Sequence, residues 1–162
     1  MESSHAASVL VTTSPVQVGQ RLADVETWTR FLIDVGAITK VAHERYDFQI
    51  VTSKHVRTSR IAVKWHLQSS SFVWTSLHGP CFEGSIRLTA DEGGWTRVNI
   101  NVNCWPEGFV ANVADLVMPA RHRSGIDEAA LRHLLEDPAE INLSEAENAE
   151  HAEHAVQRPA NR

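Results

Sequence analysis

Few side chains in this sequence of 162 residues have both the chemistry and the spacing that acid–base catalysis requires. In the segments that alternate as a β-strand does, four residues with titratable or hydroxyl side chains fall on the same face as the apolar residues: Tyr46, Ser76, His78 and Cys104. Of these, His78 lies at a turn. No His, Cys or carboxylate residues show the spacing of a metal site. We therefore assign no catalytic residue, no metal ligand and no cofactor, and we favour a binding protein over an enzyme.

A cation near the C-terminal end of the sequence is the strongest candidate for a polar ligand contact. Val110, Val113 and Val117 form an apolar stripe at helical spacing, and the next turn of the same stripe carries Arg121. A guanidinium is costly to bury alone, so it must reach solvent, a carboxylate or the polar group of a ligand. Pro119 either kinks this helix or, with the residues up to Gly125, divides it into two pieces.

The stretch from Phe72 to Pro106 predicts the elements that would position these side chains. It holds three strand-like runs, separated by turn signals at residues 78–80 and 91–94. The second and third runs alternate between apolar and polar residues over their whole length. This period-two alternation is typical of antiparallel strands with one apolar face and one solvated face.

The rest of the chain adds strands and helices around this stretch. Residues 7–12 read as a first strand, and Ser14 and Pro15 begin a helix that runs to about Leu22. A second short helix follows Asp24. Further strands are expected at 38–45, 46–50 and 56–67, and a helical segment at 109–136. The count is seven strands, with two short helices between the first and second, and a long helix at the end.

The apolar parity of these strands defines a set of inward-facing residues. We expect most of them to form an ordinary core and some of them to line a cavity. Gly84 stands inside a strand, where glycine marks either a bulge or a close approach by another group, such as a ligand or a helix. The inward residues on the strands are Phe48, Ile50, Ile61, Val63, Trp65, Phe72, Trp74, Phe82, Ile86, Leu88, Val98, Ile100 and Val102.

Charge and composition exclude several classes of protein. The formal charge of −5 falls entirely after residue 135, and a neutral body lacks the basic surface that nucleic acids require. No apolar run reaches the length of a membrane span, and the N-terminus does not resemble a signal peptide. We expect a cytoplasmic protein with a flexible N-terminus at 1–6, one domain at 7–136 and an acidic tail at 137–162. The oligomeric state is left open.

Several short motifs, in their order and spacing, resemble the START superfamily, also called SRPBCC. They are Phe72 to Ser76 with Gly79, Phe82 to Gly84, Gly93 to Val98 and Trp105 to Gly108. The sequence is most similar to the polyketide cyclase/dehydrase and coenzyme-Q-binding branch. The resemblance implies an α+β helix-grip fold, in which a curved seven-stranded antiparallel sheet wraps around a long C-terminal helix. This chain departs from the pattern at Pro119 and Gly125, which affects the expected mouth of the cavity.

The same resemblance implies a function. Such proteins bind or transport an apolar molecule, such as a lipid, an isoprenoid, a quinone or a polyketide, which they hold between the sheet and the C-terminal helix. The alternative is a polyketide cyclase or dehydratase of the aromatase type. The predicted ligand-binding residues are Phe48, Ile50, Val63, Trp65, Phe72, Trp74, Ser76, Phe82, Gly84, Ile86, Val98, Ile100, Val102, Val113, Val117 and Arg121.

Overall fold

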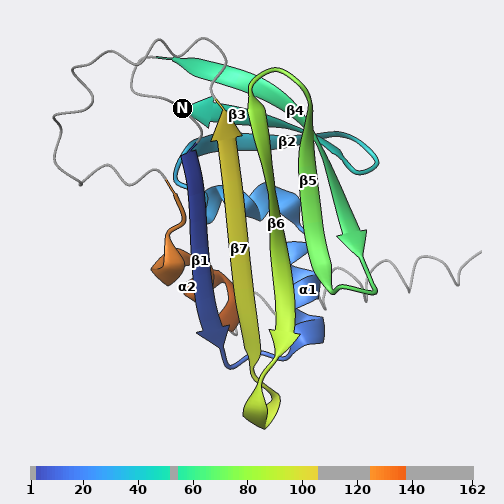
Figure 1. Cartoon of the computed structure of the whole chain (residues 1–162), viewed down its shortest axis with the longest axis vertical. Coiled ribbons are helices and arrows are strands. Elements are labelled where there is room, and N and C mark those ends of the chain that lie inside the picture. The colour runs from blue at the N-terminus through green and yellow to red at the C-terminus, as the bar shows by residue number, and fades with distance from the viewer. Residues whose placement is uncertain (1–2, 52–54, 106–124, 138–162) are drawn as a thin grey trace, which may run out of the picture.

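Seven strands form a single curved antiparallel sheet, with the spatial order β1-β7-β6-β5-β4-β3-β2 (Figure 1). The computed structural model describes residues 3–51, 55–105 and 125–137. The strands are β1 (Ser3–Val11), β2 (Val35–Ala42), β3 (Arg45–Val51), β4 (Val56–His66), β5 (Ser71–His78), β6 (Cys81–Ala90) and β7 (Thr96–Trp105). The predicted strand number and pairing type are therefore confirmed.

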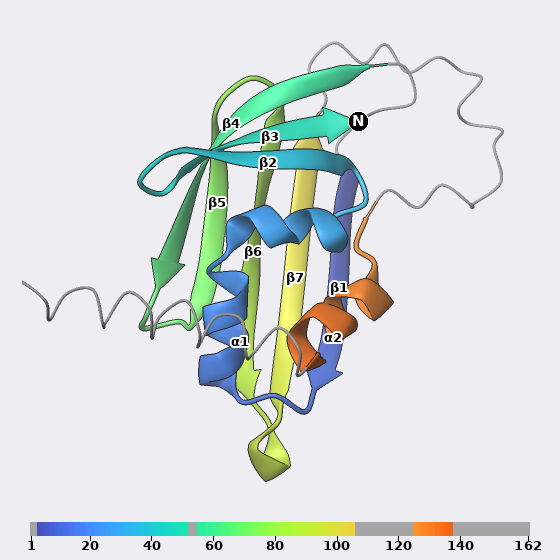
Figure 2. The same ribbon diagram turned by 180° about the vertical axis from the view of Figure 1, so that it is seen from behind.

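The two helical segments that follow β1 and the helix described at 128–136 lie on one face of the sheet, as the view from behind shows (Figure 2). Helix α1 (Pro15–Leu22) begins where the sequence predicts, because Ser14 accepts a hydrogen bond from the backbone of Gln17 and a proline follows the cap. The second short helix is the 3-10 segment η1 (Val25–Arg30). A 3-10 turn, η2 (Glu92–Gly94), joins β6 to β7. The predicted pair of helices between β1 and β2 is therefore confirmed.

The last helix, α2 (Glu128–Glu136), is shorter than the segment expected from the sequence. Asp127 caps its first turn by accepting a hydrogen bond from the backbone of Ala130 at 3.0 Å. Just before this cap, Ile126 forms a β-bridge with Leu32. A continuous helix through residues 125–127 is therefore wrong. The alternative of two helical pieces, divided near residues 118–125, depends on positions that lie outside the described residues.

Side-chain and backbone contacts fix α2 to the beginning of the chain. The backbone of Thr12 donates to Glu136 Oε1 at 3.0 Å, and Thr13 Oγ1 donates to the carbonyl of Leu135 at 2.7 Å. Arg21 Nη1 donates to the carbonyl of Leu134 at 3.1 Å. The bonds from Thr13 and Arg21 satisfy carbonyls at the C-terminal end of the helix, which have no partner within the helix itself.

The N-terminal boundary of the domain differs from the prediction. Strand β1 begins at Ser3 and pairs with β7 along its whole length, from Ser3 opposite Cys104 to Val11 opposite Thr96. Residues 3–6 therefore belong to the sheet, and the prediction that they form a flexible N-terminus is wrong. The acidic tail and the stripe of Val113, Val117 and Arg121 lie outside the described residues.

Candidate binding face of the sheet

The face of the sheet that carries the helical segments is apolar, and it holds most of the predicted site residues. We call it the concave face. Ten of those residues are at most 5% exposed, so the prediction that they point inward is confirmed; their contact with a ligand stays a prediction. They are Phe48, Ile50, Val63, Phe72, Trp74, Phe82, Ile86, Val98, Ile100 and Val102.

Trp65 is the exception among the apolar strand residues predicted to point inward. Its side chain is 40% exposed, although its ring lies 4.6 Å from that of Phe72 and against Gly19 of α1. Trp65 lies near the C-terminal end of β4, beyond Ala62, the last β4 residue paired with β3. It therefore belongs to the rim of the concave face and not to its interior.

Aromatic rings from four elements form a connected cluster on the concave face. Trp28 of η1 packs edge-on against Phe72 and Trp74, with ring centroids 5.8 and 5.3 Å apart. Trp74 stacks on Phe82 at 6.2 Å, and Phe82 lies 5.8 Å from Phe48. Trp28 is fully buried and was not among the predicted site residues. Only the fold of η1 against the sheet brings it to this cluster.

Gly84 makes room for one of these rings. A Cβ atom at this position would lie 2.2 Å from Cζ2 of Trp74 and 2.3 Å from the carbonyl oxygen of Asn101. The register between β6 and β7 runs without a shift through Gly84, which pairs with Val102, and the pair of Gly84 with Trp74 is the last between β5 and β6. The expected bulge is therefore wrong. A close approach is confirmed, but the approaching group is the indole of Trp74 and not the expected ligand or helix.

Ser76 is held by backbone groups at the turn between β5 and β6. Its Oγ accepts a hydrogen bond from the backbone N–H of Phe82 at 2.6 Å. The same oxygen lies 3.1 Å from the carbonyl of Pro80 and 3.0 Å from that of Phe82, and its single proton can serve either one. Ser59 Oγ also donates to Pro80 at 2.8 Å. These contacts give Ser76 a structural role at the turn.

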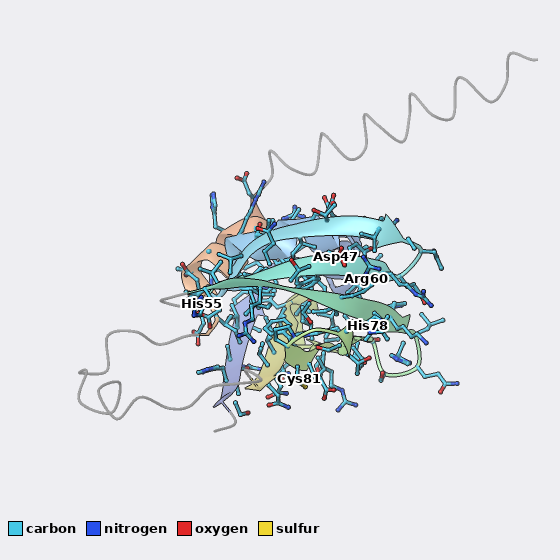
Figure 3. All side chains as sticks on the ribbon, turned by 90° about the horizontal axis from the view of Figure 1, so that it is seen from above. Asp47, His55, Arg60, His78 and Cys81 are labelled. Atoms are coloured by element: carbon cyan, nitrogen blue, oxygen red, sulfur yellow. The ribbon has the colours of Figure 1, made fainter. Side chains whose placement is uncertain are left out.

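The register between β4 and β5 turns His78 to the outer face of the sheet. It shifts between the pair Arg60 with His78 and the pair Ile61 with Ser76. His78 therefore shares the face of Arg60 and is exposed, so its predicted inward direction is wrong. Together with Asp47, these two residues line a hollow of about 200 Å³, and all three are labelled in Figure 3.

An ion pair dominates this outer hollow. Arg60 donates through Nε and Nη2 to the two carboxylate oxygens of Asp47, at 2.8 and 2.9 Å. These hydrogen bonds hold the pKa of Asp47 below its usual range. The Arg60 guanidinium is already engaged in a bidentate ion pair with Asp47. We therefore interpret this ion pair as a link between β3 and β4, and we do not interpret the hollow as a ligand site.

Two polar groups that the sequence did not reveal lie beside the concave face. His5 pairs with Val102 across β1 and β7, and so faces the same side as the buried Val9 and Val11. Asp34, in the loop before β2, is half-buried; burial raises the pKa of its carboxyl group, and the nearby His5 partly opposes this shift. The sequence did indicate the direction of His5, because Val11, Val9, Ala7 and His5 follow one another at a spacing of two residues and therefore face the same side of β1.

The two buried tryptophans of the cluster differ in their hydrogen bonding. Trp28 Nε1 donates to the carbonyl of Leu22 at 2.9 Å. Trp74 is 1% exposed, and its Nε1 has no acceptor within hydrogen-bond distance among the described residues. An indole has a single polar atom, so within the described part of the chain this side chain makes no hydrogen bond.

The remaining chemistry of the described residues is limited. Burial raises the pKa of Tyr46, and the carboxylates of Glu26, Asp24 and Glu44 act in the same direction. The described ranges contain no group of three or more His, Cys, Asp or Glu side chains placed to hold a metal ion. They also contain no helix long and apolar enough to cross a lipid bilayer.

No protein-family model and no curated protein sequence matches this chain. Several solved structures do. A Thermus thermophilus protein is 18% identical, over 83% of this chain and 90% of its own, with a TM-score of 0.57. The Zhui aromatase/cyclase of a Streptomyces species is 15% identical, over 97% of both chains, with a TM-score of 0.53. A START superfamily protein of Mycobacterium smegmatis is 9% identical, over 93% of this chain and 95% of its own, with a TM-score of 0.51.

These likenesses establish the fold. The chain has the START-like helix-grip architecture that its sequence motifs indicate, with a curved seven-stranded antiparallel sheet and a C-terminal helix. At such low identity the likeness extends to the architecture alone, and function must be argued from the site.

Proposed function

We propose that this protein binds an apolar small molecule, such as a lipid, an isoprenoid quinone or a polyketide, on the concave face beside β1. The observation that carries this proposal is the change in burial along that strand. Val11 and Val9 are 0% and 2% exposed, whereas Ala7 and His5, which face the same side, are only half-buried. The described helices therefore leave part of this apolar face less well covered.

The groups around this less covered area suit an amphipathic molecule. Ala7 lies opposite Ile100 and His5 lies opposite Val102, and both partners on β7 are apolar and buried. Asp34 and His5 supply polar groups at the edge of the same area. A pocket with apolar walls and a few polar groups is the usual form of a small-molecule site, and it orients a ligand by its polar end.

A pair of substitutions in one strand tests the proposal. Ala7→Phe adds a ring to the concave face and should reduce the affinity for cis-parinaric acid, a fluorescent fatty acid, at least tenfold. Ala6→Phe adds the same ring to the opposite, exposed face of β1 and should leave the affinity unchanged. Melting temperatures of both variants report whether they fold. Equal affinities in two folded variants would contradict a site at this position.

The predicted residues beyond β7 form a further part of the proposal, supported by their helical spacing in the sequence. We propose that Val113 and Val117 complete the apolar wall and that Arg121 meets the polar end of the ligand. The change Arg121→Ala should then weaken binding of a carboxylate ligand by about 1–3 kcal/mol without lowering stability. Titration with a fatty acid and with its methyl ester separates a charge contact from apolar burial.

A second candidate function, a cyclase or dehydratase acting on a polyketide, is favoured by the electrostatic interaction between His5 and Asp34. A half-buried carboxyl group with a raised pKa that interacts with an imidazole is suited to proton transfer. The related architecture of an aromatase/cyclase supports the same idea. If this function is correct, His5→Ala and Asp34→Asn should each abolish turnover of a poly-β-ketone substrate while leaving its binding nearly unchanged.

A further inference from the structure

We infer that the indole N–H of Trp74 selects a planar ligand with a neutral carbonyl oxygen, such as a quinone or an aromatic ketone. The inference rests on the proposed function, because it names the chemical class of the molecule that binds the concave face. It starts from one atom. Nε1 of Trp74 is buried and has no acceptor among the described residues. A buried donor without an acceptor destabilises the fold, and a ligand oxygen at this position would remove that cost.

The position of the indole places this donor toward the proposed site. Its Cε2 and Cζ2 atoms are the side-chain atoms nearest to a Cβ built on Gly84, and Cε2 is bonded to Nε1. The edge that carries the N–H group therefore lies over β6. Continuing along the same row of paired residues, Gly84 is followed by Val102 of β7 and then by His5 of β1. The row thus leads from Trp74 to the less covered part of the face.

The neighbouring polar groups are already engaged. The carbonyl of Leu22 already accepts a hydrogen bond from Trp28, whose ring centroid lies 5.3 Å from that of Trp74. On the neighbouring position of the same face, Ser76 Oγ accepts from the backbone of Phe82 and donates within the turn. The acceptor for Trp74 must therefore come from outside these contacts.

The chemistry of the surrounding residues defines the class of acceptor. Indole is a donor only, so the ligand must supply an oxygen with a lone pair. The buried polar side chains of the described chain are Ser59, Ser71 and Thr96, and none of them carries a charge. A carboxylate at Trp74 would therefore be buried without a counter-charge, at high cost, whereas a neutral carbonyl is not penalised in this way.

The arrangement of the rings favours a planar molecule. Trp74 and Phe82 are inclined by only 29°, and Phe48 follows Phe82 in the same cluster. A flat conjugated ligand that packs at the edge of this cluster can align with these rings, and aromatic pairs gain from such contact beyond the burial of apolar area. A flexible acyl chain gains no such stacking.

The test uses two planar probes of nearly equal shape, fluorenone and fluorene, which differ in one carbonyl oxygen. The indole N–H signals of ¹⁵N-labelled wild type are recorded with each probe, and the Trp74 signal is identified by its loss in Trp74→Phe. Fluorenone should move the Trp74 proton downfield, and fluorene should not. Trp28 lies in the same cluster but already donates to Leu22, so its signal is the internal control.

Affinities give the second readout. Wild type should bind fluorenone about 2- to 10-fold more tightly than fluorene, the gain expected for one hydrogen bond. Trp74→Phe should bind the two probes equally, and Trp28→Phe should retain the preference. If both probes bind wild type equally and the Trp74 signal does not move, the inference is overturned and the proposed function stands. If neither probe nor cis-parinaric acid binds, both are overturned.

Discussion

The two ends of the concave face are built differently. At one end, Val9 and Val11 of β1 are covered by α2, and Leu131 and Leu135 of that helix are 0% exposed. At the other end, His5 and Ala7 of the same strand are half-buried, although their direction is the same. The same strand thus contributes to a fully covered core and to a less covered apolar surface.

The comparison separates the residues that stabilise the fold from those that are available to bind a ligand. The covered end is held by hydrogen bonds from Thr12, Thr13 and Arg21 to the last turn of α2. At the other end the polar groups are the unmatched indole of Trp74, the half-buried Asp34 and His5. We expect changes at the first end to act on stability, and changes at the second to act on stability less and on binding more.

The largest effect is expected at the covered end. Leu131→Ala removes a fully buried side chain from α2, so it should lower the free energy of unfolding by about 2–5 kcal/mol through lost burial and the cavity left behind. Urea denaturation measures this loss. The neighbouring exposed Arg132→Ala is the control and should stay within about 0.5 kcal/mol of wild type. Similar losses in both would mean that α2 contributes little to the core.

Gly84 lies in the same row of paired residues as Trp74 and His5, and substitution there should destabilise the fold. Gly84→Ala brings a Cβ against the ring of Trp74 and the backbone oxygen of Asn101, at an expected cost of about 1–3 kcal/mol. Gly19→Ala provides a matched comparison in α1, where the added Cβ meets only ordinary contacts at 3.7 and 3.9 Å. It should raise stability by about 0.5–1 kcal/mol, since glycine disfavours helices. Thermal melts that show the same sign for both would contradict this packing.

Ser76 tests the turn at the less covered end. In Ser76→Ala the backbone N–H of Phe82 loses its acceptor in a half-buried position, so unfolding should require about 1–2 kcal/mol less. Thr75→Ala, on the exposed face of the same strand, should change stability very little. If Ser76→Ala instead weakens ligand binding at unchanged stability, Ser76 contacts the ligand and its structural role is secondary.

The smallest effect is expected from Asp34, and it depends on pH. A raised pKa means that the charged carboxylate disfavours the fold, and this cost develops as the pH rises above the ordinary value of 3.8 and is complete above the raised pKa. Asp34→Asn should therefore raise the melting temperature at pH 7 and leave it unchanged near pH 3. Asp47→Asn should do the opposite at pH 7, because Arg60 lowers the pKa of that carboxyl group. Equal responses of the two variants would contradict the assigned environments.

The local pattern of the sequence was sufficient to predict the strands, their faces and the start of α1. Alternation with a period of two specifies the direction of each side chain as soon as a segment is extended. Phe82, Ile86, Val98 and Ile100 are therefore buried as expected. The Ser14 cap with Pro15 begins α1 by interactions within one turn.

What only the tertiary structure decided depends on how strands meet. A register shift between β4 and β5 moves His78 to the outer face, although its position in the sequence alternation predicts the inner face. The indole of Trp74 fills the space beside Gly84 from the neighbouring strand, and the fold places His5 where its charge acts on Asp34. None of these relations is local in the chain, because each results from the pairing or packing of separate segments. Sequence periodicity determines which way a residue points within its own strand, and only the assembled sheet determines what it meets there.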